Sequence, residues 1–547
     1  MNQVSAEKPW LKHVPKGNPL EVDIPEISVN QLLARSVEKY PDHTAVSFYN
    51  HTLSYAQLYG AVNRVASALV QKGIEKGDRV ALMLPNCPQY PISYYAVLAC
   101  GGIVVQINPM YKAQELLHVL RDSGAKLLIA YEPLLPTVEE IKDKTDLTEV
   151  ITVSFSQGKG TFQTLLEDRG YQIPTVAINP REDVAVLQYT GGTTGRSKGA
   201  MLTHYNLVAN AMQCIGTAEI QIEYGRERTL TVAPLFHVYG MTSGMNLTFA
   251  VGGNMILLPR FDVEEVLETI EKWRPTGFPG VPTMYIGLLQ HPRFKEVDMT
   301  CFKTCSSGSA PLPIEVLNKV KAETGAPIAE GYGLSEASPV THRNPVRGLQ
   351  KPGSIGIPLP NTDAKIVDMA TGQEELPPGE VGELIIKGPQ VMKGYWNMLE
   401  ETAHTLRNGW LYTGDLAKMD EDGFFYIVGR KKELILAGGY NVYPVEVEDV
   451  IYSHPAVLEA AVIGVPDAYR GETVKAVVVL REGATLETEE LIAYCRERLA
   501  NYKVPRLVEF RSELPKSAVG KILKRKLKEE QSNLSSPAND PAQKGDA

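Results

Sequence analysis

The stretch of chain between residues 189 and 199 constrains fold and function more than any other. It reads YTGGTTGRSKG, with four glycines, three threonines, one serine and two cations. Residues 184–188 before it are typical of a short buried strand, and residues 202–212 after it predict a helix. A strand, a polar glycine-rich loop and a helix together gather backbone N–H groups around a phosphate, and Lys198 adds positive charge. The loop is therefore predicted to bind phosphate, although a Gly/Thr-rich surface linker has the same composition.

The order of residues around Lys198 excludes one class of phosphate-binding protein. In a P-loop NTPase the lysine follows a glycine and precedes a serine or threonine. Here Lys198 follows Ser197 and precedes Gly199. The loop is not a Walker A motif.

Length, charge and cysteine content limit the remaining classes. A chain of 547 residues is expected to form two to four domains or subdomains. Its net charge of −9 argues against binding to nucleic acid through phosphate neutralisation. Its six cysteines form no CxxC pair, which argues against a zinc site or a disulfide framework and favours a reducing compartment.

Two long stretches without Asp, Glu, Lys or Arg, residues 80–111 and 229–259, have the length of membrane spans. Pro, Gly, Asn and Gln interrupt both, so we expect buried segments of a large core instead. Residues 1–19 lack the apolar segment of a signal peptide. These features predict a cytoplasmic protein.

The hydrophobic pattern predicts an α/β fold. Strands at residues 79–84, 102–107 and 126–131 alternate with helices at residues 53–72, 90–99 and 113–123. Such alternation indicates βαβ units and a mostly parallel sheet, whose ligands gather at the carboxyl ends of the strands.

The pattern of predicted elements changes twice toward the C-terminus. Between residues 353 and 425, short β-like runs and Pro/Gly turns predict a small β-subdomain. After residue 433 the pattern predicts a compact α+β unit that ends in a basic helix at residues 521–530. The tail from residue 532 is rich in Ser, Pro, Asn, Asp and Gly and is predicted to be disordered.

Five side chains stand out, and three of them have both a functional and a structural interpretation. His237 is either a core histidine or part of a site, and it has no partners at metal-ligand spacing. Glu336 suits Mg²⁺, which takes one or two carboxylates plus substrate phosphates, or it is an acid in a solvated turn. Tyr332, between two glycines, offers a face to an adenine ring. Asp415 suits ribose hydroxyls or forms a simple turn, and Lys521 alone is typical of a solvated basic run.

Six motifs, taken together, resemble the adenylate-forming superfamily. Within it, the sequence is most similar to the long-chain fatty-acyl-CoA ligases, and the resemblance runs from about residue 30 to about residue 527. The motifs stand in the family's order and spacing, at residues 189–199, 234–240, 331–336, 409–415, 429–444 and 515–521.

The resemblance implies a reaction in two steps at one site. A carboxylate attacks the α-phosphate of ATP·Mg²⁺ to give acyl-AMP and pyrophosphate, and the thiol of coenzyme A then displaces AMP. The carboxylate is already ionised at pH 7, so the first step needs no general base. It needs two anions to be brought together and their charge to be neutralised. The resemblance assigns the neutralisation of charge to Lys521.

The resemblance also implies roles for particular residues. The residues implied in catalysis are Lys521, His237 and Thr190. The residues implied to hold phosphate are Thr190, Gly191, Gly192, Thr193, Thr194 and Lys198, and those implied to hold Mg²⁺ are Thr190 and Glu336. The residues implied around adenosine and the acyl group are Gly308, Ser309, Ala310, Pro311, Glu330, Gly331, Tyr332, Gly333 and Ser335. Further nucleotide- or coenzyme-binding positions are Asp415, Ile427, Arg430, Lys432, Gly438 and Gly439.

The resemblance further implies a moving domain. The expected parts are an N-terminal AMP-binding domain (residues 1–430), a mobile C-terminal domain (residues 431–531) and a disordered tail (residues 532–547). The C-terminal domain swings about a hinge that matches Lys432. One pose brings in Lys521, and the other presents residues 437–440 beside a pantetheine tunnel, where glycine keeps the passage open. His237 matches the gate of that tunnel, and Leu436 departs from relatives that carry a lysine used in thioester formation.

Two alternatives remain at this stage. A medium-chain or aryl-acid CoA ligase belongs to the same superfamily and is distinguished by its acid substrate. A non-catalytic acyl-adenylate-binding module belongs to another class, and Lys521, Glu336 and Asp415 argue against it. The expected partners are a fatty acid, ATP and coenzyme A, without nucleic acid. Loose peripheral membrane contact and a monomer or homodimer fit the lipid substrate.

Overall fold

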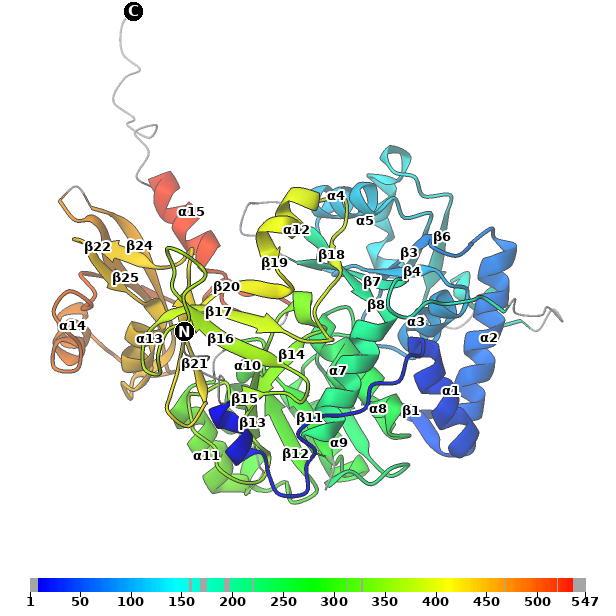
Figure 1. The fold of residues 1–547 in the computed structure, drawn as a ribbon, viewed down its shortest axis with the longest axis horizontal. Coiled ribbons are helices and arrows are strands. Elements are labelled where there is room, and N and C mark those ends of the chain that lie inside the picture. The colour runs from blue at the N-terminus through cyan, green and yellow to red at the C-terminus, as the bar shows by residue number, and fades with distance from the viewer. Residues whose placement is uncertain are drawn as a thin grey trace, which may run out of the picture.

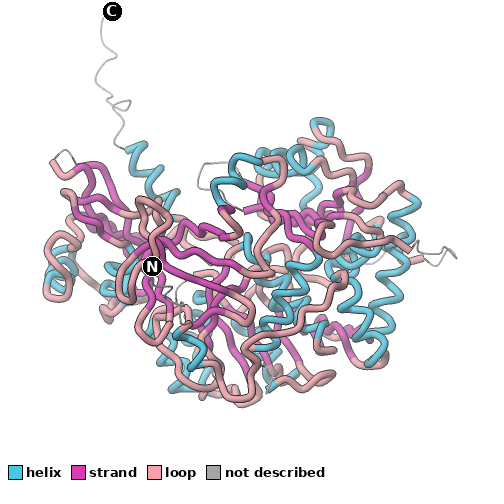
Figure 2. Tube along the Cα trace, in the orientation of Figure 1, coloured by secondary structure: helices cyan, strands magenta, loops and turns pink. Residues whose placement is uncertain are grey.

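Four β-sheets carry the strands of the protein (Figure 1). The computed structural model describes residues 8–156, 160–167, 175–190, 197–218, 221–310, 312–325, 328–467, 469–518 and 520–534. Two of the sheets are mostly parallel and two are mostly antiparallel, and strands and helices interleave throughout the larger part of the molecule (Figure 2). The predicted α/β class is confirmed.

The first sheet has nine strands in the order β15-β14-β13-β12-β11-β9-β10-β1-β2. Strands β1, β10, β9, β11, β12 and β13 pair in parallel, whereas β2, β14 and β15 are antiparallel to their neighbours. The strands are β1 (Thr44–Phe48), β2 (His51–Ser54), β9 (Arg228–Thr231), β10 (Asn254–Leu257), β11 (Gly277–Gly280), β12 (Thr304–Ser307), β13 (Ile328–Gly333), β14 (Val340–Arg343) and β15 (Ile357–Pro358).

The second sheet has seven strands in the order β18-β8-β7-β4-β3-β5-β6. Strands β7, β4, β3, β5 and β6 are parallel, and β8 and β18 add two antiparallel pairings at one edge. The strands are β3 (Arg79–Met83), β4 (Ile103–Gln106), β5 (Leu127–Tyr131), β6 (Glu149–Val153), β7 (Val184–Thr190), β8 (Lys198–Thr203) and β18 (Gly394–Tyr395).

One group of helices lies between these two sheets, because its side chains form a single hydrophobic core with strands of both. This group comprises α1 (Val29–Lys39), α2 (Tyr55–Gln71), α3 (Gln89–Ala99), α7 (His204–Gly216), the π-helical segment η5 (Gly240–Asn246) and α8 (Leu247–Ala250). Capping boxes begin α1 at Ser28 and α2 at Ser54. In each, the serine side chain accepts a hydrogen bond from the backbone N–H of a glutamine, and the glutamine side chain accepts one from the backbone N–H of the serine.

Other helices cover the outer faces of the two sheets. The first sheet packs against α9 (Val263–Trp273), α10 (Pro282–Gln290) and α11 (Ile314–Thr324). The second packs against α4 (Ala113–Ser123) and α5 (Leu135–Glu139). Helix α6 (Phe162–Leu165) instead packs against α2, and its buried side chains belong to the core between the sheets. Short 3-10 turns are η1 (Pro9–His13), η2 (Glu132–Leu134), η3 (Lys142–Lys144), η6 (Pro292–Lys295) and η7 (Ser335–Ala337).

The two long uncharged stretches lie inside this layered core. Residues 80–111 contain most of β3, all of α3 and β4, and residues 229–259 contain most of β9, with η5, α8 and β10. All but the two ends of α3 is buried, which explains why its sequence carries no charge. Within the described residues, no helix combines the length and the hydropathy needed to cross a membrane.

The predicted β-subdomain is present and extends to Arg430. Its sheet runs in the order β16-β17-β20-β19, and β21 pairs with β20. The elements are β16 (Asp363–Val367), β17 (Gly382–Lys387), α12 (Leu399–Thr405), β19 (Leu406–Arg407), β20 (Trp410–Met419) and β21 (Phe425–Arg430).

The C-terminal α+β domain has hydrophobic clusters of its own and lies at one end of the molecule (Figure 1, orange to red). Its sheet runs β23-β22-β25-β24, and β26 pairs with β25. The elements are β22 (Ile435–Ala437), β23 (Tyr440–Val442), α13 (Pro444–Tyr452), β24 (Val457–Asp467), β25 (Gly471–Leu480), α14 (Thr488–Arg496), β26 (Leu507–Arg511) and α15 (Lys524–Leu534).

The boundaries predicted for the last helix were wrong at both ends. Helix α15 begins at Lys524 rather than Lys521, because backbone bonds from Ser517 to Lys521 and from Leu523 to Pro515 hold the preceding residues in a tight loop. The helix continues to Leu534, so residues 532–534 are helical and not part of a disordered tail. Residues 535–547 of the predicted tail lie outside the described residues.

Candidate active site

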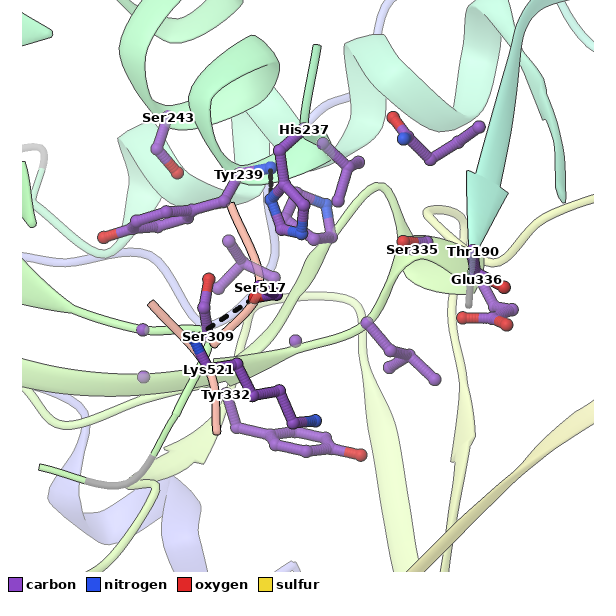
Figure 3. Close-up of a pocket in the computed structure, with 18 of the residues that line it drawn as sticks. Thr190, His237, Tyr239, Ser243, Ser309, Tyr332, Ser335, Glu336, Ser517 and Lys521 are labelled. Atoms are coloured by element: carbon purple, nitrogen blue, oxygen red, sulfur yellow. Dashed lines mark hydrogen bonds between the residues drawn. The ribbon is translucent and has the colours of Figure 1, made fainter. Parts of the chain in front are cut away.

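A cavity of about 1080 Å³ lies where the strand ends of both large sheets, the β-subdomain and the C-terminal domain meet (Figure 3). Residues from all these parts line it, as expected for ligand sites at the carboxyl ends of parallel strands. The predicted site residues on its wall are Thr190, Lys198, His237, Gly308, Ser309, Gly331, Tyr332, Gly333, Ser335, Glu336, Arg430, Lys432 and Lys521.

The phosphate loop joins two strands rather than a strand and a helix. Strand β8 pairs antiparallel with β7, with Lys198 opposite Thr190. Helix α7 begins only at His204, because Thr203 accepts a hydrogen bond from the N–H of Asn206 and caps the helix. The helix predicted from residue 202 is thus present but begins two residues later, and strand β8 before it was not predicted. Strand β8, and not a helix N-terminus, follows the loop. The prediction of phosphate binding therefore depends on the amides and side chains of the loop alone.

Five of the predicted binding residues cannot be placed. Gly191, Gly192, Thr193, Thr194 and Pro311 lie outside the described residues.

Lys198 is buried and is held by a carboxylate. Its Nζ forms an ion pair with Glu401 of α12 and lies 5.1 Å from the centre of the Tyr395 ring. Only 7% of Lys198 is exposed, and its hydrogen bond lowers the pKa of Glu401. A phosphate bound here, as the sequence predicts, would compete with Glu401 for the same ammonium group.

Glu336 and Thr190 lie on the same side of the cavity (Figure 3). The turn η7, which contains Glu336, packs against β7 and β8. Oε1 of Glu336 accepts a hydrogen bond from the Tyr395 hydroxyl at 2.7 Å, which orients the carboxylate and leaves Oε2 without a bond to any described residue. The described residues contain no group of three or more His, Cys, Asp or Glu that could hold a metal ion. A single carboxylate beside a phosphate site nevertheless fits Mg²⁺, which completes its shell with phosphate oxygens and water.

Tyr332, Asp415 and Arg430 form a connected group across two sheets. The Tyr332 hydroxyl donates to Oδ2 of Asp415 at 2.5 Å, and Nε of Arg430 lies 3.0 Å from Oδ1 of the same carboxylate. The strand pairing of β20 with β21 sets Asp415 opposite Arg430. Asp415 itself is 4% exposed and does not line the cavity, whereas its two partners do.

Lys521 enters the cavity from the C-terminal domain (Figure 3). Burial, and then the charge of Arg430, lower the pKa of its amine to about 8. The amine is therefore mostly protonated at pH 7. Its loop is fixed by the bond from the Lys521 N–H to Oγ of Ser517 and by an ion pair of Lys516 with Glu459 at 2.6 Å.

His237 faces the cavity as a neutral imidazole. Its Nδ1 accepts a hydrogen bond from the N–H of Tyr239 at 3.3 Å, so the proton of the neutral ring lies on Nε2. Burial, and then the nearby charge of Lys521, lower the pKa of His237 to about 4.

Other predicted residues lie away from the cavity wall. Ala310 does not line it, and Ile427 packs in the core of the β-subdomain. Gly438 and Gly439 are exposed, and the N–H of Gly438 donates to the carbonyl of Arg470 within the C-terminal domain. In this pose the cavity holds Lys521 together with Thr190, Lys198, Tyr332 and Arg430, and the two glycines lie outside it.

Glu330 is also off the wall. Its carboxylate accepts the N–H of Gly353 at 3.2 Å, and the residue is 8% exposed. Burial is the main cause that raises the pKa of Glu330 to about 7, from an ordinary 4.5.

This raised pKa predicts a pH-dependent contribution to stability. The folded protein holds the proton of Glu330 more tightly than the unfolded chain, so its contribution is complete below pH 4.5 and is lost as pH rises through about 7. We expect Glu330→Gln to change the free energy of unfolding little at pH 5 and to raise it at pH 8, on the order of 2–3 kcal/mol. Urea denaturation at the two pH values measures this. Glu315→Gln, at an exposed position of α11, is the control. A loss of stability at pH 8 in Glu330→Gln would contradict the sign.

The sequence alone did not identify Tyr395 and Glu401. They lie some 200 residues after Lys198 and reach it because β18 pairs with β8, with Tyr395 opposite Ala200. Strand β18 has only two residues and carries no pattern that a sequence reading could detect.

Known families match both parts of the chain. The AMP-binding enzyme family matches residues 33–396, and the AMP-binding enzyme C-terminal domain matches residues 446–521. The chain belongs to the AMP-binding enzyme family.

Individual proteins match over nearly the full length. A long-chain-fatty-acid–CoA ligase of Bacillus subtilis (strain 168) is 49% identical over 555 residues, which cover 96% of this chain and 99% of the relative. The crystal structure of ATP-bound MatB from Rhodopseudomonas palustris is 35% identical, with a TM-score of 0.86, and the match covers 93% of this chain and 100% of that one. Apo MatB, 36% identical with the same coverage, has a TM-score of 0.75.

Proposed function

We propose that this protein is an ATP-dependent ligase that converts a long-chain fatty acid to acyl-AMP and pyrophosphate and then transfers the acyl group to coenzyme A. The observation that carries the proposal is the position of Lys521. A lysine of the C-terminal domain lines the same cavity as Thr190, Glu336 and Arg430 of the larger part. The similarity to the Bacillus subtilis ligase supports the long-chain substrate.

In the first step the protein brings two anions together. The carboxylate of the acid is ionised at pH 7, so catalysis consists of orientation and charge stabilisation. The Lys521 ammonium is placed to neutralise charge that develops at the α-phosphate. His237, neutral and with a proton on Nε2, offers a hydrogen-bond donor beside that position without adding a second charge.

The nucleotide would lie along the wall formed by β13 and the β-subdomain. Asp415, fixed by Tyr332 and Arg430, would accept hydrogen bonds from the ribose hydroxyls, and Tyr332 would stack beside adenine. Thr190 and Lys198 would bind the phosphates that leave. Glu336 and Thr190 would hold Mg²⁺, which supplies additional positive charge to the phosphate oxygens when it is bound.

The second step requires a different domain pose. The similarity is greater to ATP-bound MatB than to apo MatB, which supports assigning the present pose to adenylation. We propose that the C-terminal domain, residues 431–531, then rotates about Lys432 and brings Gly438 and Gly439 to the cavity. Leu436 lies on β22, just before the turn that holds these glycines; it is 54% exposed, and its N–H is bonded to Glu472 at 2.8 Å. Its apolar side chain supplies no charge for the thioester step.

Three further parts of the proposal concern the setting of the enzyme. We propose a cytoplasmic location with loose peripheral contact with membranes that hold the lipid substrate, and a monomer or homodimer. Fractionation of cells and light scattering of the purified protein test them.

Release of pyrophosphate tests the function directly. We expect release that requires both a fatty acid and Mg²⁺, and a thioester product only when coenzyme A is added. Palmitate, medium-chain acids, benzoate and coumarate form the substrate panel. Far better use of benzoate or coumarate than of palmitate would replace the long-chain assignment with the aryl-acid alternative.

The Lys198–Glu401 ion pair makes a specific prediction for ATP binding. We expect Lys198→Ala to raise the KM for ATP by roughly ten- to a hundredfold, since a charged hydrogen bond to phosphate is lost while the other donors of the loop remain. Glu401→Gln removes the competitor of the phosphate and is expected to leave this KM unchanged or lower it. A rise in both variants would mean that Glu401 positions the lysine for ATP instead of competing.

A further inference from the structure

The cavity extends along the first sheet from the carboxyl ends of its strands to their amino ends. At the carboxyl end it is lined by Gly308 and Ser309, which follow β12, and at the amino end by Thr229, Gly277 and Thr304. The last three residues lie side by side at the starts of β9, β11 and β12, because Gly277 is opposite Thr229 on one side and opposite Thr304 on the other. The cavity therefore spans the full length of β11.

The three positions face the helices that lie between the two large sheets. Each is followed in its strand by a residue of the core on the outer face of the sheet, namely Leu230, Phe278 and Cys305. Neighbouring residues of a strand point to opposite faces. The Thr229 hydroxyl accordingly accepts a hydrogen bond from Thr248 of α8 at 2.7 Å. Position 277 therefore faces the interior of the cavity.

One side of a helix forms the opposite wall. Ser243, Leu247 and Val251 line the cavity at intervals of four residues, which places them on one face of η5 and α8. Ser243 lies near Tyr239, at the end of the cavity that holds His237 (Figure 3). The eight residues from there to Val251 descend roughly 12 Å along the sheet. The far half of the passage is thus bordered by apolar side chains.

The reacting end of the cavity lies at the carboxyl end of β11. A Cβ added at Gly520, next to Lys521, would overlap Oγ1 of Thr283, three residues after β11 ends at Gly280. From Gly280 back to Gly277 the strand spans roughly 10 Å. C–C bonds of about 1.5 Å in a zigzag advance about 1.3 Å per carbon, so about eight carbons of an acyl chain cover this distance.

Ion pairs lie at the amino end of the passage. Nζ of Lys303 pairs with Glu223 and with Glu227, each at 2.9 Å, and Glu227 also accepts a hydrogen bond from the Thr276 hydroxyl. Lys303, Glu227 and Thr276 border the cavity. The apolar part of the passage ends at these charges, and Gly277 lies immediately before them.

The backbone at position 277 does not require glycine. The φ of Gly277 lies outside the left-handed region, so a side chain would cause no backbone strain. A Cβ here would lie 3.6 Å from Oγ1 of Thr304 and 4.0 Å from Oγ1 of Thr229, which are ordinary contacts. A glycine in a strand weakens it and often marks a place where a ligand approaches the backbone closely. What the glycine provides here is open space in the passage.

We propose that Gly277 determines the chain lengths that the enzyme accepts, because an acyl chain of more than about eight carbons passes between Gly277 and α8. The inference rests on the proposed function and assigns a specificity-determining residue to the same site. A long-chain acid needs the space at position 277, whereas a short acid ends before it.

A panel of acids tests the proposal. The value of kcat/KM is measured by pyrophosphate release with hexanoate, decanoate and palmitate in the wild type, Gly277→Ala and Gly277→Leu. We expect Gly277→Leu to lower the palmitate-to-hexanoate ratio by roughly ten- to a hundredfold, the effect of overfilling a packed apolar space. Gly277→Ala should lower the ratio less, and hexanoate should be used similarly by all three proteins.

Two further variants separate the passage from general effects of substitution. Thr304→Leu enlarges the side chain opposite Gly277 in the neighbouring strand and should lower the ratio as well. Gly60→Leu is the control, because Gly60 lies in α2, away from the cavity wall, and its added Cβ would lie 3.5 Å from Nη1 of Arg64, an ordinary contact. This variant should leave the ratio unchanged.

An unchanged palmitate-to-hexanoate ratio in Gly277→Leu would overturn the proposal. Equal losses with hexanoate and palmitate would also do so, because they would show a general disturbance of the site. If Gly277→Leu does not fold, Gly277→Ala and Thr304→Leu decide the question. If the wild type activates no acid, the proposed function fails. Calorimetric titration with palmitate then tests position 277 separately, and equal affinity in the wild type and Gly277→Leu would contradict its role.

Discussion

Replacing Lys521 with alanine is expected to slow formation of acyl-adenylate by roughly a thousandfold, the effect of removing a preorganised charge from a reacting phosphate. Thioester formation from supplied acyl-AMP should survive, because in the proposed rotation the lysine leaves the cavity before that step. Pyrophosphate release and coenzyme A-dependent AMP release from acyl-AMP measure the two steps separately.

Lys516→Ala is the control for this experiment. It removes a cation of the same loop whose Nζ is paired with Glu459 at 2.6 Å inside the C-terminal domain. We expect a much smaller effect on adenylation. Equal loss of both steps in Lys521→Ala would contradict the division of labour between the two poses.

Gly520→Val is expected to slow adenylation because it disturbs the contact between the two domains, although it removes no reacting group. A Cβ at Gly520 would come within 2.4 Å of Oγ1 of Thr283, at the start of α10 in the larger part. The loop that carries Lys521 could then not seat in the cavity without a shift. We expect roughly a hundredfold slower adenylation, the effect expected when a reacting group is held about 1 Å out of place, with thioester formation from acyl-AMP retained.

Gly483→Val separates the clash from backbone strain. Gly483 has φ of 73°, almost the same as the 72° of Gly520, but no atom lies within 4 Å of its added Cβ. Both variants incur the strain of a left-handed conformation, on the order of 1–2 kcal/mol, but only Gly520→Val should impair adenylation. Similar losses in the two variants would show that strain, and not the contact with Thr283, is responsible.

Much of the fold could be predicted because its core strands are strongly patterned. The strands at residues 79–84, 102–107 and 126–131 were predicted and are present as β3, β4 and β5, since a run of buried apolar residues is visible in any single sequence. Strand β8 was not predicted, and the helix expected from residue 202 begins only at His204. Strand β8 contains Gly199 and Ala200, which have low strand propensity, and it forms through pairing with β7 on one side and β18 on the other.

The candidate site, too, could be predicted from the sequence only in part. Thr190, Glu336 and Lys521 stand in separate motifs, and the structure brings all three to one cavity. Tyr395 and Glu401 carry no motif. They reach Lys198 only through the pairing of β18 with β8, which cannot be read from residues adjacent in sequence.

The separate hydrophobic clusters of the C-terminal domain have a consequence for the energetics of turnover. Within the described residues, the two clusters of this domain contain only residues between Ile435 and Leu527, and the other four clusters contain no residue beyond Ile427. The proposed rotation of the domain would therefore leave every one of these cores closed. Substitutions that improve the packing of a single core are then expected to raise heat resistance without slowing turnover.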